Sequence, residues 1–399
     1  MSVWRALLLV IALVACTSET DDGGTTVDTG QTAQHDPDDS GRLVILDDSG
    51  DIVVMRPDGS ERLAMTDDAG QTALYTQPIW SPDATTLAFG HVTEDGFAVG
   101  ISRPEDEEVT SVPTTNLPFY MFWSPDGANL GVLHNGTSGV EFRIVDVDAG
   151  TSASLDEDSP FYFSWSPEGD RVVTHAGEDR AETIATDGTR TALDPTAGTY
   201  LAPQWTPEGV FHVVDDVLVL ETPEERRAIS AVAGVTLFVV NPQGTLVALQ
   251  STGDGSDVTA STEELPTVAT RAVVVVDVVT GEAEIVRNGL ALGFFWSPDG
   301  ESLLVLTQTD TGLVPVVWRA DSEDLVYDAY LPPARMLEDT FPFFPQYAQS
   351  LRFWAPDSSA FAYAGAVGDE RGIWVQELDS EDPTKVSEGV WVDWSPAAP

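Results

Sequence analysis

Cysteine and basic residues are scarce in this chain. Cys16 is the sole cysteine and Lys385 the sole lysine among 399 residues. A single cysteine excludes a disulfide framework, a zinc cluster of cysteines and a catalytic cysteine inside the fold. With 18 Lys+Arg against 66 Asp+Glu, the formal net charge is -48. This charge argues against nucleic-acid binding and against unaided binding to an anionic membrane, because both need clustered basic residues.

Sequence motifs of several enzyme classes are also missing. The chain has no G-x-S-x-G elbow of serine hydrolases, no H-E-x-x-H zinc motif and no phosphate loop. None of its acidic clusters has the alternating ligand spacing of a calcium loop. Hydrophobic residues nevertheless make up 42%, with 11 Trp and 16 Phe, so the chain can bury a sizeable core. The sequence therefore indicates a folded, acidic protein and points to no particular reaction.

A short apolar run stands at the N-terminus. Arg5 precedes the apolar residues 6–15, and ten residues of helix cover about 15 Å, half of a bilayer core. We therefore interpret residues 1–15 as a signal peptide and not as an anchor helix. The run ends in Leu-Val-Ala-Cys, which resembles the bacterial lipobox and implies lipidation of Cys16. Thr17 favours the outer membrane by the same resemblance; the alternative is an ordinary signal peptide with a chance cysteine.

The next stretch is polar and acidic. Residues 17–41 consist mostly of Thr, Asp, Gly, Ser and Gln. Such a composition cannot bury enough surface to offset the entropy lost on ordering. We expect the lipidated cysteine and a disordered acidic tether over residues 16–41, followed by one folded domain over residues 42–399. A flexible chain of this length spans roughly 25–30 Å.

One short phrase repeats along the folded part. It joins Trp to Ser-Pro-Asp-Gly or a close variant, and its copies begin at Trp80, Trp123, Trp165, Trp205, Trp296, Trp354 and Trp394, with a degenerate copy at 240–244. Ser, Pro, Asp and Gly in this order are typical of a β-turn, since Pro fixes φ and Gly supplies the left-handed exit. Apolar runs follow each turn and indicate buried strands. Each repeat is therefore predicted to be a unit of four short strands.

The spacing of the copies predicts a closed ring. Residues 42–80 and 395–399, left over at the two ends, add up to one further unit. Its strands are expected at 43–47, 52–55 and 62–66 from the N-terminal side and at 389–394 from the C-terminal side. Closure of this kind removes exposed sheet edges. We predict an all-β protein with a single β-propeller of eight four-stranded blades, or seven if the degenerate copy merges with a neighbour. No stretch has a convincing helical period.

The repeated phrase and the apolar strand after it resemble the TolB-type propeller repeat of bacterial periplasmic proteins. A similar repeat occurs in prolyl-oligopeptidase-type peptidases, whose hydrolase domain has no counterpart here. The resemblance covers residues 42–399 and implies a propeller in the cell envelope, facing the periplasm or the cell surface. It implies no particular function, because propellers host unrelated activities.

Histidines and acidic residues supply candidate binding groups. His91, His134 and His175 each follow their Trp by 10 or 11 residues, which places them at the ends of the second strands of consecutive blades, on one face of the ring. Acidic residues occupy the adjoining loops: Asp47, Asp48 and Asp51; Glu94 and Asp95; Glu178 and Asp179; Asp369 and Glu370. A divalent cation or a basic partner could bind there. The alternative is that these are ordinary strand-end and solvated residues.

Two insertions lengthen the repeat, at 251–271 and 327–348. Because strands alternate in direction, both emerge on the face that carries the histidines. The second insertion contains an aromatic run at 341–347, which either plugs the channel or binds a partner. In the latter case Phe343, Phe344 and Tyr347 are the expected anchors, because aromatic side chains give a large contact area at small entropic cost.

These observations lead to two interpretations of function. The first is a monomeric, lipid-anchored envelope propeller that acts as a non-catalytic binding or scaffolding module for another envelope protein, without a cofactor. The second is a ligand-binding or metal-assisted enzymatic propeller with its site at the channel mouth. In either case we expect the site on the histidine face, because the residues of the repeated turns are explained by turn geometry alone.

Overall fold

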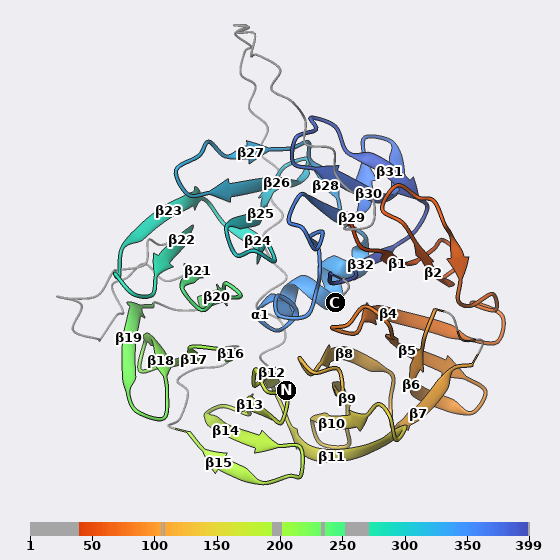
Figure 1. Cartoon of the computed structure of the whole chain (residues 1–399), viewed down its shortest axis with the longest axis horizontal. Coiled ribbons are helices and arrows are strands. Elements are labelled where there is room, and N and C mark those ends of the chain that lie inside the picture. The colour runs from red at the N-terminus through yellow and green to blue at the C-terminus, as the bar shows by residue number, and fades with distance from the viewer. Residues whose placement is uncertain are drawn as a thin grey trace, which may run out of the picture. The chain divides into compact units, whose positions relative to one another are not determined.

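Short antiparallel strands make up almost all of the regular structure in residues 40–104, 106, 108–193, 202–232, 236–251 and 271–397, which the computed structural model describes. The strands form small sheets arranged around a centre (Figure 1). The predicted all-β propeller is confirmed. The signal peptide, Cys16, the tether and nearly all of the 251–271 insertion lie outside the described residues.

Five sheets each take four consecutive strands, whose order in the sheet follows the sequence. The first comprises β4 (Leu74–Trp80), β5 (Leu87–Thr93), β6 (Gly96–Ser102) and β7 (Thr110–Thr114). The second comprises β8 (Pro118–Trp123), β9 (Asn129–Asn135), β10 (Val140–Asp146) and β11 (Thr151–Asp158). The third comprises β12 (Phe161–Trp165), β13 (Arg171–Ala176), β14 (Arg180–Ala185) and β15 (Arg190–Ala192). The fourth comprises β16 (Gln204–Thr206), β17 (Gly209–Val214), β18 (Val217–Glu221) and β19 (Arg226–Ala231). The fifth comprises β20 (Thr236–Val240), β21 (Leu246–Ser251), β22 (Ala272–Asp277) and β23 (Ala283–Asn288), and the degenerate copy of the phrase at 240–244 connects β20 to β21.

A larger sheet joins the next two repeats. It contains β24 (Ala291–Trp296), β25 (Ser302–Thr309), β26 (Gly312–Arg319), β27 (Leu325–Val326), β28 (Tyr330–Leu331), β29 (Ala360–Val367), β30 (Glu370–Glu377) and β31 (Thr384–Ser387). The short strand β28 pairs with β26 through Leu313 and with β29 through Val367 and Ala366. The ring has eight units if this sheet is divided at β28, so the blade count depends on that division.

The last sheet closes the ring. Its order is β3 (Leu63–Ala64), β2 (Ile52–Met55), β1 (Leu43–Leu46) and β32 (Trp391–Trp394), so the final strand of the chain pairs with the first. Leu43 lies opposite Trp394 and Leu46 opposite Trp391, and all four side chains are buried. The predicted pairing of the two ends of the folded chain is confirmed.

The repeated phrase forms the expected turn. The amide of Gly127 donates to the carbonyl of Ser124 at 2.9 Å, and Gly127 has φ +71°. Ala84 takes the same left-handed position in its own copy, with φ +57°. In the first copy the Ser81 hydroxyl donates to the Asp83 carboxylate. The turn residues are therefore accounted for by local geometry.

The tryptophans link neighbouring sheets. The indole N–H of Trp165 donates to the Phe122 carbonyl at 2.9 Å, and Trp354 donates to Phe295 at 3.0 Å. Each acceptor lies in the innermost strand of the preceding sheet. This contact gives one aromatic residue two roles, because it packs between sheets and satisfies a buried carbonyl.

Asp393 ties the closing strand to both of its neighbours. Its carboxylate accepts the amide of Trp80 at 3.2 Å and the amide of Arg352 at 3.0 Å, and its side chain is completely buried. The Arg352 guanidinium donates to the Trp80 carbonyl at 2.7 Å and lies 3.8 Å from the carboxylate. Burial raises the pKa of Asp393 to about 6, although Arg352 and the two amides oppose this shift.

The raised pKa of Asp393 predicts a pH-dependent contribution to stability. The carboxyl of the unfolded chain has the ordinary pKa of 3.8. The folded state therefore holds the proton more tightly, and the stabilisation is complete below pH 3.8 and is lost as the pH rises through about 6. Relative to Asp393→Asn, the wild type should lose up to about 3 kcal/mol of unfolding free energy over this range. Urea unfolding at several pH values measures the difference, and parallel curves for the two proteins would contradict it.

Ring closure is tested by truncation. Removal of residues 389–399 deletes β32 and exposes the edges of β1 and of the adjoining inner strands, so we expect loss of the cooperative melting transition or aggregation. Removal of residues 397–399 alone serves as the control and should leave the transition unchanged. A protein that ends at residue 388 and melts like the parent would disprove closure by β32.

Candidate functional site

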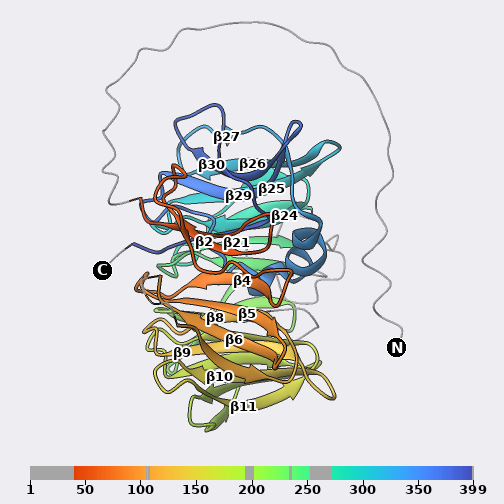
Figure 2. The same ribbon diagram turned by 90° about the vertical axis from the view of Figure 1, so that its right-hand side faces the viewer.

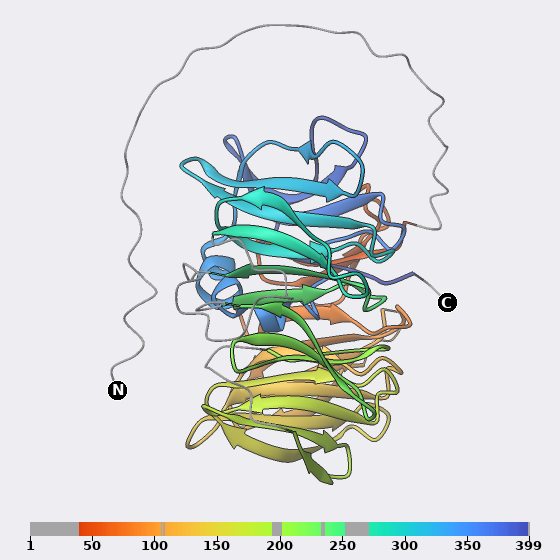
Figure 3. The ribbon, with the colours of Figure 1, turned by 90° about the vertical axis from the view of Figure 1, so that its left-hand side faces the viewer.

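The ring has two distinct faces. We call the side with the repeated Trp-Ser-Pro-Asp-Gly turns the turn face, and the opposite side, where the β5–β6 and β13–β14 hairpins lie, the plug face. The plug face is named for residues 332–351, the plug segment, which leaves β28 and returns to the centre of the ring. Edge-on views show the helical part of this segment on one side of the ring and the C-terminus on the other (Figures 2 and 3).

The plug segment contains three short helical turns in succession. They are a π-helix (Met336–Thr340), a 3₁₀-helix (Phe341–Phe343) and α1 (Phe344–Tyr347). These turns are not expected from the sequence, in which no stretch has a convincing helical period. Pro342 and Pro345 fall in first turns, where the missing N–H has no helical partner to lose. Turns this short show no helical periodicity in the sequence.

The ribbon of α1 lies at the centre of the ring (Figure 1), and its aromatic side chains pack against the inner strands. The Phe344 ring packs edge-on against Phe294 and Phe295 of β24, with centroids 4.8 and 5.4 Å apart. The Tyr347 ring packs at 5.0 Å against Tyr120 of β8. Both plug residues are buried.

Polar contacts fix the plug in the channel. The buried side-chain amide of Gln346 accepts the Phe163 N–H at 2.9 Å and donates to the Phe163 carbonyl at 2.8 Å, as a neighbouring strand would. The Tyr347 hydroxyl accepts from the Gln77 amide at 3.0 Å and donates to the Phe119 carbonyl. The segment thus bonds to the inner strands β4, β8 and β12. These contacts support the interpretation of residues 341–347 as a plug.

The burial of α1 changes what its aromatic residues can do. Phe344 and Tyr347 present no more than 4% of their surface, so neither offers an exposed anchor to a partner. Of the three proposed anchors, Phe343 alone keeps partial exposure. The pair Phe343 and Phe344 therefore provides a matched test.

We predict that Phe344→Ala lowers the unfolding free energy by about 3–5 kcal/mol, because it leaves a cavity between the plug and β24. Phe343→Ala, the control, should cost clearly less because its side chain is only partly buried. Chemical denaturation of both variants measures the difference. Equal small losses would show that the plug does not seat Phe344.

The three candidate histidines lie where the repeat places them, in β5, β9 and β13, but each has its own surroundings. His91 Nε2 lies 3.2 Å from the Ser111 hydroxyl, and burial lowers the pKa of His91, opposed by Asp68. His134 Nδ1 lies 3.0 Å from the Asn135 carbonyl. The His175 ring lies 6.3 Å from that of Tyr162. All three are buried. In the part of the chain that the structure describes, no three His, Cys, Asp or Glu side chains are grouped to hold a metal ion.

The acidic candidates lie at the hairpins of the plug face. The β1–β2, β5–β6, β13–β14 and β29–β30 hairpins carry the residues expected from the sequence, and two more follow the same rule, Asp215 in β17–β18 and Asp310 in β25–β26. The β9–β10 hairpin has no acid of its own. Its Gly139 amide instead donates to the Glu157 carboxylate at 3.0 Å. Carboxylates therefore recur around this face from one sheet to the next.

Most of these hairpin carboxylates lack a partner. Glu94, Asp95, Glu178, Asp179, Asp215, Asp310 and Asp369 are exposed, and among the described residues their side chains accept no hydrogen bond and form no ion pair. The Asp carboxylates of the repeated turns differ. Asp83 and Asp126 accept the hydroxyls of Ser81 and Ser124 within the turn. The hairpin carboxylates of the plug face are therefore available to an external group.

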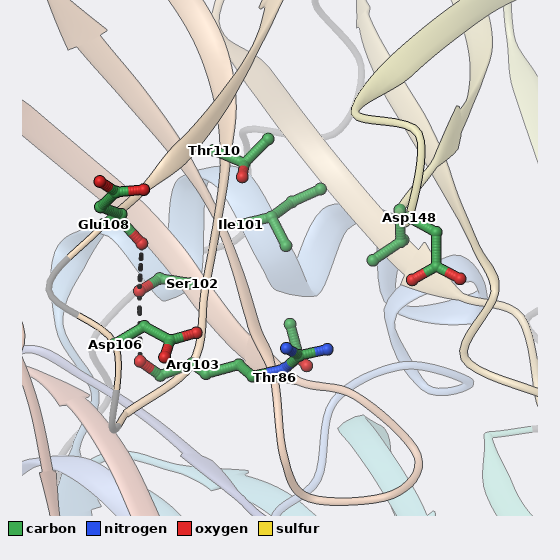
Figure 4. A pocket seen from close by; sticks show the side chains of 9 residues that line it. Thr86, Ile101, Ser102, Arg103, Asp106, Glu108, Thr110 and Asp148 are labelled. Atoms are coloured by element: carbon green, nitrogen blue, oxygen red, sulfur yellow. Dashed lines mark hydrogen bonds between the residues drawn. The ribbon is translucent and has the colours of Figure 1, made fainter.

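A hollow of about 490 Å³ opens on the turn face, between the β4–β7 and β8–β11 sheets. Figure 4 shows its labelled lining residues, with Arg103 and Asp148 reaching in from different sheets. The Ser102 hydroxyl donates to the carbonyls of Arg103 and Glu108 at 3.4 Å. No sequence motif marks this hollow, because its residues come from loops of two repeats.

No family model matches the sequence, and no curated protein matches it. Solved structures do resemble it. A eukaryotic initiation factor aligns at 10% identity over 90% of this chain and 98% of its own, with a TM-score of 0.55. An oligogalacturonate lyase in complex with manganese aligns at 13% identity over 86% and 98%, with a TM-score of 0.53. TolB from Acinetobacter baumannii aligns at 15% identity over 71% and 62%, with a TM-score of 0.40.

At these identities the similarity shows the fold alone. The similar structures include both a lyase and a protein named as an initiation factor, so the fold does not select a function. No helix among the described residues is long and apolar enough to cross a membrane.

Proposed function

We propose that this protein is a lipid-anchored β-propeller of the cell envelope, a monomeric and non-catalytic binding module whose binding surface is the plug face. The observation that carries the proposal is the recurrence of exposed, unpaired carboxylates at the hairpins of that face. The plug adds to it. Because α1 fills the centre of the ring with buried aromatic residues, a partner meets a continuous surface and not an open channel.

The point at which the chain enters the ring is compatible with an anchor. The Ser40 carbonyl accepts the Trp394 indole N–H at 2.7 Å, and the Arg42 carbonyl accepts the Ser395 amide at 2.8 Å, both at the turn face. The chain therefore enters the ring at the turn face, opposite the plug face. The lipobox-like end of residues 1–16 supplies the anchor in this proposal.

The anchor and the face are tested separately in the native envelope. Cys16→Ser should move the protein from the detergent phase to the soluble fraction or leave an uncleaved precursor, whereas Ser18→Ala should change nothing. A cleaved Cys16→Ser protein that still partitions with membranes would refute lipidation.

For the face, Glu94→Gln with Asp95→Asn should reduce co-purification of partner proteins. The matched control is Glu224→Gln with Glu225→Gln, two exposed acids between β18 and β19 on the turn face. Both variants remove two charges, so an effect of net charge alone would be equal in both. If the first variant retains its partners, or if both variants lose them equally, the plug face is not the binding surface.

The second candidate is a ligand-binding or metal-assisted enzyme with its site at the channel mouth. The observation that supports this candidate is the structural similarity to a lyase solved in complex with manganese. Metal analysis of the purified mature protein distinguishes it from the first, since a binding module of the kind proposed needs no stoichiometric metal.

A further inference from the structure

Exposed apolar side chains gather on one arc of the plug face. Six of the large hydrophobic residues that the structure shows as exposed lie on this face: Leu74, Phe97, Leu290, Leu331, Leu337 and Val390. Their exposure ranges from 37% for Phe97 to 56% for Leu331. Five of them belong to three sheets that follow one another around the ring: the β24–β31 sheet with the loop before it, the closing sheet and the β4–β7 sheet (Figure 1). The sixth, Leu337, belongs to the plug segment. We call this set the apolar arc.

Strand pairing and the plug fix the positions of part of the arc. Leu74 lies opposite Val92, which lies opposite Phe97, so these three side chains form a row across the first sheet. In the closing sheet, the Val390 amide donates to the Leu46 carbonyl at 2.9 Å. A small hollow of about 40 Å³ lies between the π-helix of the plug and the start of β32, and Met336 and Val390 both line it.

Negative charge flanks the arc. The hairpins beside it carry Asp48, Glu94, Asp95, Asp310 and Asp369, all exposed. Two of the nearby basic residues are paired with acids. Arg335 pairs with Asp339 at 3.3 Å, and Lys385 pairs with Glu388 at 2.6 Å. Arg371 follows Asp369 and Glu370, so that hairpin keeps a net negative charge.

We infer that the apolar arc docks a basic, amphipathic segment of a partner protein, with Leu- or Phe-like side chains against the arc and Lys or Arg against the flanking carboxylates. This inference rests on the proposed binding role of the plug face and names the chemistry of its partner. Charge decides between possible occupants. A second copy of this chain also carries -48, and its acidic tether and an anionic lipid surface carry the same sign, so all three are repelled. Apolar burial supplies the affinity, and the carboxylates speed association and select the sign of the partner.

The test uses a fluorescent fourteen-residue helical peptide of Leu and Lys as the probe. The protein is the full mature chain with Cys16→Ser, which needs no detergent. Anisotropy titrations at 50 and 500 mM NaCl should show binding that weakens at least tenfold at high salt. A peptide of the same pattern with Glu in place of Lys should not bind. Equal binding of the two peptides would overturn the inference.

Variants locate the site. Leu337→Ser with Val390→Ser removes apolar contact area from the arc and should weaken binding of the Leu/Lys peptide about tenfold or more. Both side chains are already exposed and contribute little to the fold, so the variant should remain folded. The control is Val279→Ser with Val326→Ser, which are more exposed, at 73% and 60%, and lie away from the arc. If melting shows that the first variant is unfolded, Leu74→Ser with Phe97→Ser tests the same arc. Unchanged binding in the folded arc variant, or equal losses in the control, would overturn the inference.

The outcome is separable from that of the proposed function. If native partners depend on Glu94 and Asp95 but the Leu/Lys peptide does not bind, the plug face is a binding surface and the inferred partner chemistry is wrong. If the peptide binds through the arc but no native partner depends on the hairpin acids, the inference holds and the proposed function fails.

Discussion

The pairing of β32 with β1 is the constraint on which the rest of this structure depends. Each sheet packs its inner strand against the centre, and the indoles of Trp165, Trp296 and Trp354 each bond to the preceding repeat, so the sheets support one another only while the circle is complete. Asp393 shows how close this dependence is. Its carboxylate, in the closing strand, accepts the amide of Trp80 in β4 on one side and that of Arg352, in the segment before β29, on the other. A buried carboxyl in this place is acceptable because both of its oxygens are hydrogen-bonded.

The plug satisfies backbone groups of the inner strands that ring closure leaves facing the channel. A ring of sheets leaves inner-strand amides and carbonyls facing a channel, and Gln346 satisfies two of them at Phe163. The plug also decides where recognition can occur. Because α1 occupies the channel, the groups open to a partner lie on the faces of the ring, and the plug face carries both acidic hairpins and exposed apolar residues.

Turn chemistry is what made the architecture predictable from sequence. Ser-Pro-Asp-Gly is a local signal, and its repetition gave both the strand units and the closure of β1 with β32. The plug helices and the bridge through β28 escaped prediction, because two-residue strands and four-residue helices have no periodicity and form through contacts far along the chain. The sequence also could not predict which of the candidate carboxylates lack a hydrogen-bond partner. Asp47 and Asp95 are both hairpin acids in the sequence, and the structure alone shows that Asp47 accepts the amides of Ser49 and Asp51 whereas the Asp95 side chain has no partner among the described residues.

The position of the plug and of β32 near the end of the chain sets the order of folding during synthesis. The ribosome produces β1–β3 first, yet their fourth strand is made some 340 residues later, at Trp391–Trp394. The inner strands β4, β8 and β12 likewise wait for Gln346 and Tyr347. A growing chain therefore carries an open arc of sheets with an unpaired edge at each end until the last few residues emerge. A nascent protein of this design is exposed to edge-to-edge association for almost the whole of its synthesis, and its strong negative charge provides the repulsion that keeps such open arcs apart.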